Sequence, residues 1–187
     1  MFCGYALDAN GLSSSAREQF RQAAEGFERN NANDVDSLNS LRCRYHYGRL
    51  ASDHEPYDRS WPYWGAAEQS LLRAAQGLAR LLSPLHDEAY AAQLGYATAL
   101  QKNCHDQEAL QQFERTRQLA KQKGLPKNHH TIRDITRGIE ECKFWLSKPA
   151  AIRSGDRLQL ARERVTQMQK AEYLRRATGH WSAKRVG

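Results

Sequence analysis

The sequence lacks the long apolar run that a membrane span requires. No stretch of about 18 apolar residues occurs in its 187 positions, so we expect no membrane insertion. The N-terminal MFCGYALDANG has no basic region and only a short apolar stretch, which argues against a secretory signal peptide. The cysteines, Cys3, Cys43, Cys104 and Cys142, are widely spaced and form no CxxC pair. We therefore expect reduced thiols in a cytoplasmic protein, without a zinc or other metal site.

Recognisable catalytic motifs are also missing. The sequence contains no Glu-x-x-His, HExxH or GxSxG motif and no glycine-rich loop of the kind that cradles phosphate. We therefore predict a protein that is not an enzyme, with no catalytic residue and no cofactor.

Two His-Asp dipeptides, His86-Asp87 and His105-Asp106, support an alternative. With an upstream histidine (His46 or His54) and Asp134, they resemble the ligands of the HD-domain metal-dependent phosphohydrolases. This resemblance implies a divalent metal that activates water for attack on phosphate. The residues that usually follow the pair are missing, however. Both dipeptides also fall at expected helix starts, where capping and the helix dipole favour an aspartate.

Glycine and proline are few, with 12 and 5 residues, which predicts long regular elements joined by short turns. Apolar residues recur at helical spacing throughout, so we predict an all-α fold of about seven antiparallel helices arranged in helical hairpins. The first two expected helices begin at a Ser15-x-x-Glu18 capping box and at an Asp34 cap. The next four cover about residues 61–82, 86–102, 106–124 and 131–146. A seventh is capped by Ser154 or Asp156.

One packing pattern repeats in these helices: alanine, then a large apolar residue four positions later, then a small residue after three more. It occurs at Ala16-Phe20-Ala23, Ala67-Leu71-Ala74 and Ala109-Phe113-Thr116, and more weakly at Ala161-Val165-Met168. The small residues let a neighbouring helix approach, and the large residue fills the groove beside it. The pattern resembles the second helix of a tetratricopeptide repeat, and residues 92–126 match best, with Cys104 at the usual turn glycine. This implies a tetratricopeptide-like right-handed array with long, irregular repeats; the alternative is a compact helical bundle.

The tetratricopeptide resemblance implies a protein-binding module, acting as an adaptor, chaperone or regulator. Such arrays bind a peptide or a partner helix in a groove lined by the first helix of each pair. The basic members of the expected groove would suit an acidic peptide or a terminal carboxylate. Alternatively, its two tyrosines belong to the core. The groove candidates are Arg42, Tyr45, His46, Arg49, Gln93, Tyr96, Lys102, Arg133 and Arg137.

An aromatic segment, EPYDRSWPYWG at positions 55–65, interrupts the otherwise polar sequence. Its Ser60 and Pro62 suit a helix start, and the repeat alignment identifies the segment as an insertion between two paired helices. Its aromatic residues either fold back onto the array, which we favour, or form an exposed binding patch. These residues are Tyr57, Trp61, Tyr63 and Trp64.

The net charge of +7 is concentrated at the C-terminus, where residues 150–187 hold nine basic and three acidic residues. A second functional class is therefore nucleic-acid binding, through Arg157, Arg164, Arg175 and Arg176. As a third alternative, this amphipathic segment caps the array or mediates self-association. We thus predict an N-terminal arm (1–14), a tetratricopeptide-like domain (15–149), a basic capping helix (150–178) and a flexible tail (179–187).

Overall fold

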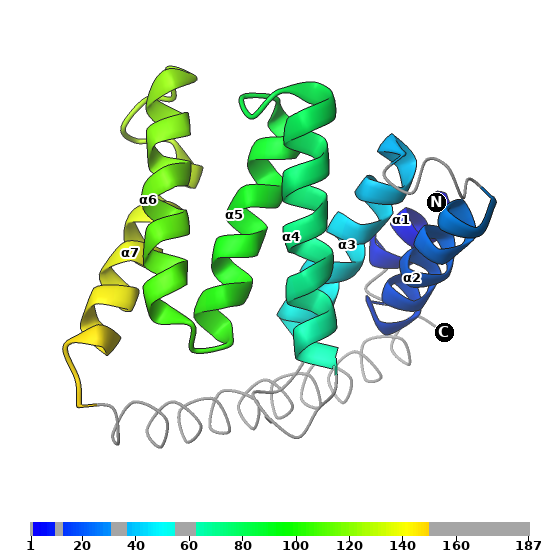
Figure 1. The fold of residues 1–187 in the computed structure, drawn as a ribbon, viewed down its shortest axis with the longest axis horizontal. Helices are drawn as coiled ribbons and strands as arrows, with labels where there is room; N and C mark the ends of the chain where they lie inside the picture. The colour runs from blue at the N-terminus through cyan, green and yellow to red at the C-terminus, as the bar shows by residue number, and fades with distance from the viewer. Residues whose placement is uncertain (1, 10–12, 31–36, 55–62, 150–187) are drawn as a thin grey trace, which may run out of the picture.

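The computed structural model describes residues 2–9, 13–30, 37–54 and 63–149, and the statements below concern these residues. They form seven α-helices and no strand, which confirms the all-α prediction (Figure 1). The helices are α1 (Phe2–Ala9), α2 (Ser13–Asn30), α3 (Leu38–His54), α4 (Tyr63–Leu82), α5 (Asp87–Lys102), α6 (Asp106–Gln122) and α7 (His130–Leu146). None of the helices in these ranges combines the length and apolar character that a membrane-spanning helix needs.

The expected helices between residues 15 and 146 correspond to α2 through α7. The helix expected after Ser154 or Asp156 lies outside the described residues. The structure has one helix that the sequence did not predict, α1, which lies in the segment expected to be only an arm. It packs against α2, where Gly4 meets the Phe20 ring.

Two helices begin at other residues than the sequence predicts. Helix α2 begins at Ser13, so Ser15 already lies in its first turn and the predicted capping box is wrong. The Glu18 carboxylate instead accepts hydrogen bonds from Arg21 and Gln22. At the start of α3, the Ser37 hydroxyl accepts a hydrogen bond from the Ser40 N–H at 3.3 Å, as an N-cap does. Asp34, the expected cap, lies outside the described residues.

The ends of α5 and α6 share one geometry. Cys104 (φ 65°) and Gly124 (φ 73°) both adopt the left-handed conformation, and the N–H of the next residue donates back to the helix, to Leu100 O and Ala120 O respectively. This is the Schellman arrangement, in which glycine is preferred. Cys104 thus holds a conformation that glycine favours, as expected of a residue at a turn position.

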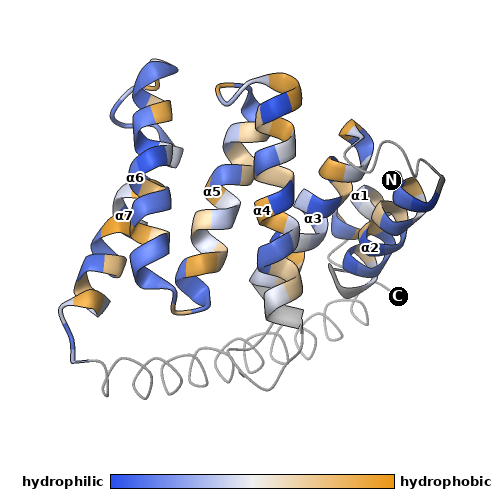
Figure 2. Ribbon diagram, viewed as in Figure 1, coloured by the Kyte–Doolittle hydropathy of each residue, from blue (hydrophilic) through white to orange (hydrophobic). Residues whose placement is uncertain are grey.

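The helices pack mainly against their neighbours in the chain. Further contacts join α3 to α5 and α5 to α7, so that these alternate helices lie side by side. Figure 1 shows the resulting row, with α1 and α2 at one end and α6 and α7 at the other. In Figure 2 the side of α6 that faces the viewer is mostly hydrophilic, while α4 and α5 in the middle of the row are more hydrophobic.

The repeated packing pattern lies in the core. Its large members, Phe20, Leu71 and Phe113, are each at most 2% exposed. Each also meets a glycine of a neighbouring helix: a Cβ built on Gly4, Gly48 or Gly138 would lie 2.9, 2.6 or 2.5 Å from the matching side chain. The large residue of one helix therefore occupies the space where its neighbour has no side chain, as the pattern predicts.

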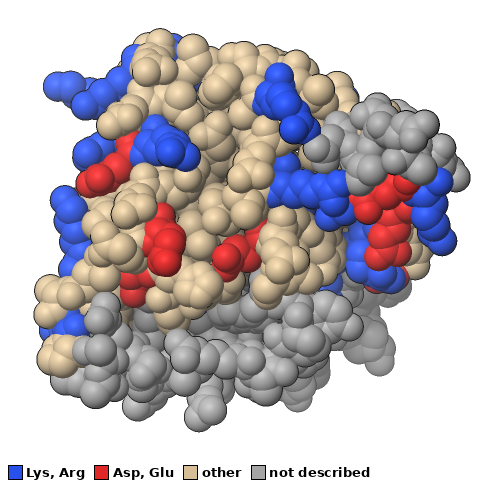
Figure 3. Space-filling model, viewed as in Figure 1, with Lys and Arg blue, Asp and Glu red and all other residues tan. Residues whose placement is uncertain are grey.

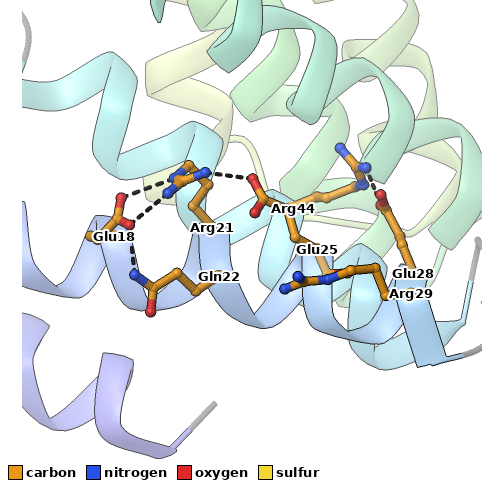
Figure 4. A network of polar contacts seen from close by, with 7 residues as sticks. All are labelled: Glu18, Arg21, Gln22, Glu25, Glu28, Arg29 and Arg44. Atoms are coloured by element: carbon orange, nitrogen blue, oxygen red, sulfur yellow. Dashed lines mark hydrogen bonds and ion pairs between the residues drawn. The ribbon is translucent and has the colours of Figure 1, made fainter.

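The outer face of α2 is covered by ion pairs (Figure 4). Arg21 bridges Glu18 and Glu25 within the helix, and its hydrogen bonds lower the pKa of Glu18 to about 2. Glu28 pairs with Arg44, which joins α2 to α3. The exposed pairs within α2 contribute little stability, whereas the Glu28–Arg44 pair is half-buried between the two helices.

Candidate functional site

A groove of about 470 Å³ crosses the face formed by α3, α5 and α7. We call it the α3–α5–α7 groove. Its floor is one face of α5, with Leu71 of α4 and Asp87 at the edge, and its walls come from α3 and from the start of α7 with the preceding loop. The floor residues are Tyr90, Ala91, Leu94, Gly95 and Thr98; the walls are Tyr45, Arg49 and Ser52 on one side and Lys123, Leu125, His129, His130, Thr131 and Asp134 on the other.

Three of the floor residues have small side chains. Ala91, Gly95 and Thr98 follow one another at helical spacing along α5. A Cβ on Gly95 would lie 3.2 Å from Leu71 Cδ2 and 3.6 Å from Tyr45 Cε2. Leu71 and Tyr45 therefore border the floor at Gly95, and Tyr90 and Leu94 add larger side chains to it.

Each charged residue that lines the groove has a partner among the described residues. Arg49 donates to Asp8 of α1 at 2.6 Å, and Asp134 accepts from Arg137 at 3.0 Å. Lys123 pairs with Asp87 and also donates to the Leu85 carbonyl at 2.8 Å. The hydrogen bond from Lys123 lowers the pKa of Asp87.

Some of the uncharged polar side chains at the groove are engaged, but the buried Tyr90 hydroxyl has no hydrogen-bond partner among the described residues. The Thr98 hydroxyl donates to Leu94 O at 3.0 Å. His129 Nδ1 accepts from the Thr131 N–H at 3.3 Å and so caps α7. The groove therefore offers a ligand mainly apolar contact, together with the unpaired Tyr90 hydroxyl.

Of the predicted groove residues, the structure places only Tyr45 and Arg49 in the groove wall. The Lys102 ammonium donates to the Ser52 carbonyl at 2.7 Å. Gln93 is 6% exposed, and Tyr96 packs against the core. Arg133 and Arg137 are exposed on α7, and Arg42 and His46 lie on α3.

Arg42 and His46 both hold helices together. The Arg42 guanidinium donates to both carboxylate oxygens of Glu88, at 2.7 and 2.8 Å, and lowers the pKa of that carboxyl. This pair joins α3 to the first turn of α5. The His46 ring stacks on Phe20 at a centroid distance of 5.0 Å and meets the edge of Tyr5 at 4.7 Å. Burial, and then the nearby Arg49, lower the His46 pKa to about 4.

The wall formed by the α6–α7 loop contains none of the residues predicted for the groove. Gly124 and Pro126 mark a helix end, and His129 and His130 suggest only a turn, so no local signal placed this loop against α5. Lys123, Leu125 and His129 reach the groove through the packing of α7 on α5. Tyr90 and Leu94 could have been predicted as groove residues, since both belong to the apolar stripe of α5.

Several predictions fall on residues whose surroundings are not described. Tyr63 and Trp64 are the first two residues of α4, while Tyr57 and Trp61 lie outside the described residues. Arg157, Arg164, Arg175 and Arg176 also lie outside. On the face of the described part seen in Figure 3, acidic and basic side chains are interspersed and form no continuous basic patch.

Both His-Asp dipeptides lie at helix starts. His86 Nδ1 accepts from the Glu88 N–H and caps α5. His105 Nδ1 lies 3.3 Å from a carboxylate oxygen of Glu68, and Asp106 opens α6. Within the described ranges, no three His, Cys, Asp or Glu side chains are grouped so that they could hold a metal ion.

None of the family models, curated proteins or solved structures compared with the chain matches it.

Proposed function

We propose that this protein is a non-enzymatic interaction module that binds a segment of a partner protein in the α3–α5–α7 groove and acts as an adaptor, chaperone or regulator. The observation that carries the proposal is the groove itself, an open and mainly apolar surface across three alternate helices. The repeated packing pattern on α2, α4 and α6 supports a tetratricopeptide-like architecture. The free thiols of Cys43, Cys104 and Cys142 fit a cytoplasmic location.

The size of the groove favours a segment over a whole globular surface. Sixteen described residues line it, whereas a standard protein–protein interface uses about 20–30 residues on each side. The charged side chains of the groove are paired within the protein, and the buried Tyr90 hydroxyl is left as an unpaired polar group.

The proposal can be tested by selecting a random linear peptide library on the full chain and on two variants. Ala91→Trp adds a large ring to the groove floor, whereas Gln69→Trp adds the same ring to an exposed position of α4 outside the groove. We expect related sequences to be enriched on the wild-type chain and on Gln69→Trp, but not on Ala91→Trp. Equal enrichment on all three chains would contradict the proposal. Circular dichroism melts confirm that each variant is folded.

A further inference from the structure

Tyr90, on the floor of the α3–α5–α7 groove, carries a polar group that the fold does not use. Its side chain belongs to the core cluster that packs α5 against α6 and α7, and the residue is 6% exposed. Its hydroxyl is buried and has no hydrogen-bond partner among the described residues. A phenylalanine would fill the same space without the cost of burying an unpaired hydroxyl. The hydroxyl is therefore a candidate contact for a ligand in the groove that Tyr90 lines.

The protonation of this hydroxyl decides which ligand atom suits it. Burial raises the pKa of Tyr90 to about 12, so the group keeps its proton throughout the neutral pH range. A phenol is also a better hydrogen-bond donor than acceptor, because its oxygen lone pairs are shared with the ring. The complementary ligand atom is therefore an acceptor, such as a carbonyl oxygen.

The surroundings of the hydroxyl restrict the charge and size of the ligand. Arg49, Lys123 and Asp134 in the groove walls are each paired with a charged residue of the protein. A charged ligand would have to break one of these pairs or remain unpaired among apolar side chains such as Leu71 and Leu94. The groove volume of about 470 Å³ falls within the range of about 300–1,000 Å³ that is typical of small-molecule sites.

We propose that the α3–α5–α7 groove also binds a small, uncharged and mainly apolar molecule whose carbonyl-type oxygen accepts a hydrogen bond from the Tyr90 hydroxyl. Small-molecule sites commonly have this composition, with apolar and aromatic side chains and a few polar groups that fix the orientation of the ligand. The site depends on the groove and on Tyr90, and not on the partner segment proposed above. Because both would cover the same floor, the molecule and the segment exclude one another.

Three matched sets of small molecules test the site on the full chain. The first set consists of bicyclic aryl ketones, the second of the hydrocarbons in which CH₂ replaces the C=O group, and the third of carboxylic acids of similar size. Dissociation constants are measured by NMR titration. We expect each ketone to bind about three- to tenfold more tightly than its hydrocarbon, the contribution of one neutral hydrogen bond. The acids should bind more weakly than the ketones, and tighter binding of the acids would contradict the uncharged ligand.

A matched pair of variants connects this preference to one hydroxyl. Tyr90→Phe removes the hydroxyl alone, and Tyr96→Phe makes the same change at a half-buried tyrosine of α5 that does not line the groove. The preference for ketones should disappear in Tyr90→Phe and persist in Tyr96→Phe. In infrared spectra, the carbonyl band of the bound ketone should lie at lower wavenumber on the wild-type chain than on Tyr90→Phe, since a hydrogen bond weakens the C=O bond. Denaturation should show Tyr90→Phe to be no less stable than the wild-type chain.

The outcomes separate this ligand from the partner segment. A ketone preference that persists in Tyr90→Phe, an unshifted carbonyl band or a failure of all ketones to bind would overturn the small-molecule site. A clear loss of stability in Tyr90→Phe would show that the hydroxyl is already paired in the free protein, and would also overturn it. Ketone binding that depends on Tyr90, without peptide enrichment that depends on Ala91, would overturn the proposed function and leave the small-molecule site in place.

Discussion

The ring of Phe113 on α6 lies against Gly138 on α7, where a Cβ would come within 2.5 Å of the ring Cζ atom. Phe113 is 2% exposed, and its neighbours Ile135 and Ile139 are also buried, so the ring has no space to retreat. Phe20 with Gly4 and Leu71 with Gly48 repeat the relationship. In the interior, a large residue of one helix is therefore repeatedly paired with a glycine of the neighbouring helix.

Gly138→Ala should destabilise the protein by about 1–3 kcal/mol, the usual cost of overpacking, because the new methyl group collides with Phe113. Chemical denaturation monitored by circular dichroism measures the change. Gly26→Ala is the matched control: it also lies within a helix, but nothing lies within 4 Å of the new Cβ. There we expect no loss, or a gain of up to about 1 kcal/mol. Equal losses in the two variants would show that the contact with Phe113 is unimportant.

Cys104→Gly should stabilise the protein by about 0.5–1 kcal/mol, since Cys104 holds a left-handed conformation (φ 65°) that glycine adopts without strain. Gly124→Ala is the reciprocal change at φ 73°, where the new Cβ meets no other atom. It should destabilise by about 1 kcal/mol through backbone strain alone. Thermal melts of both variants compare the two helix ends, and a destabilised Cys104→Gly protein would contradict the strain argument.

Acidification should weaken the fold through His46. Its pKa is about 4 in the folded protein, against 6.5 for a free side chain. Between these pH values the unfolded chain binds a proton that the folded protein does not, so stability falls as pH decreases from about 6.5 to about 4. Burial is the main cause, Arg49 adds to the shift, and Asp8 and Glu88 oppose it.

The His46→Leu variant should lose this part of the pH dependence while keeping an apolar contact with Phe20. The comparison uses denaturation midpoints of the two proteins across this pH range. An unchanged pH profile in His46→Leu would mean that other groups dominate the acid response.

Phe20→Ala should cost about 3–5 kcal/mol, the range for a fully buried phenylalanine. Phe20 is 0% exposed and contacts Tyr5, His46 and Gly4. Phe144→Ala removes the same ring from a position that is 54% exposed, and we expect a loss within about 0.5 kcal/mol. Denaturant titration of both variants checks the contrast. A large effect at Phe144 would reveal a contact beyond those described.

The helices could be predicted from sequence because their apolar stripes and stop signals are local, as at Gly124. Helix α1 was missed because it spans only eight residues and is held by Phe20 and Arg49, which are distant in the sequence. The groove was only partly predictable. Helical periodicity identifies the faces of α5, but it does not say which face meets α4 and α6. Gln93 and Tyr96 were therefore assigned to the groove, although Gln93 is buried and the half-buried Tyr96 packs against the core on the side of α4 and α6.

The pairing of each helix with its nearest neighbours in the chain has a consequence for how the molecule assembles. Contacts that are local in sequence have a low entropic cost of loop closure, so folding should be fast and able to start at any adjacent pair of helices. Among the described residues, α7 at the end of the row packs on α6 and α5 only, while α4 lies between α3 and α5. Amide hydrogens should therefore exchange sooner in α7 than in α4, with opening that begins at the ends of the row and reaches the middle last.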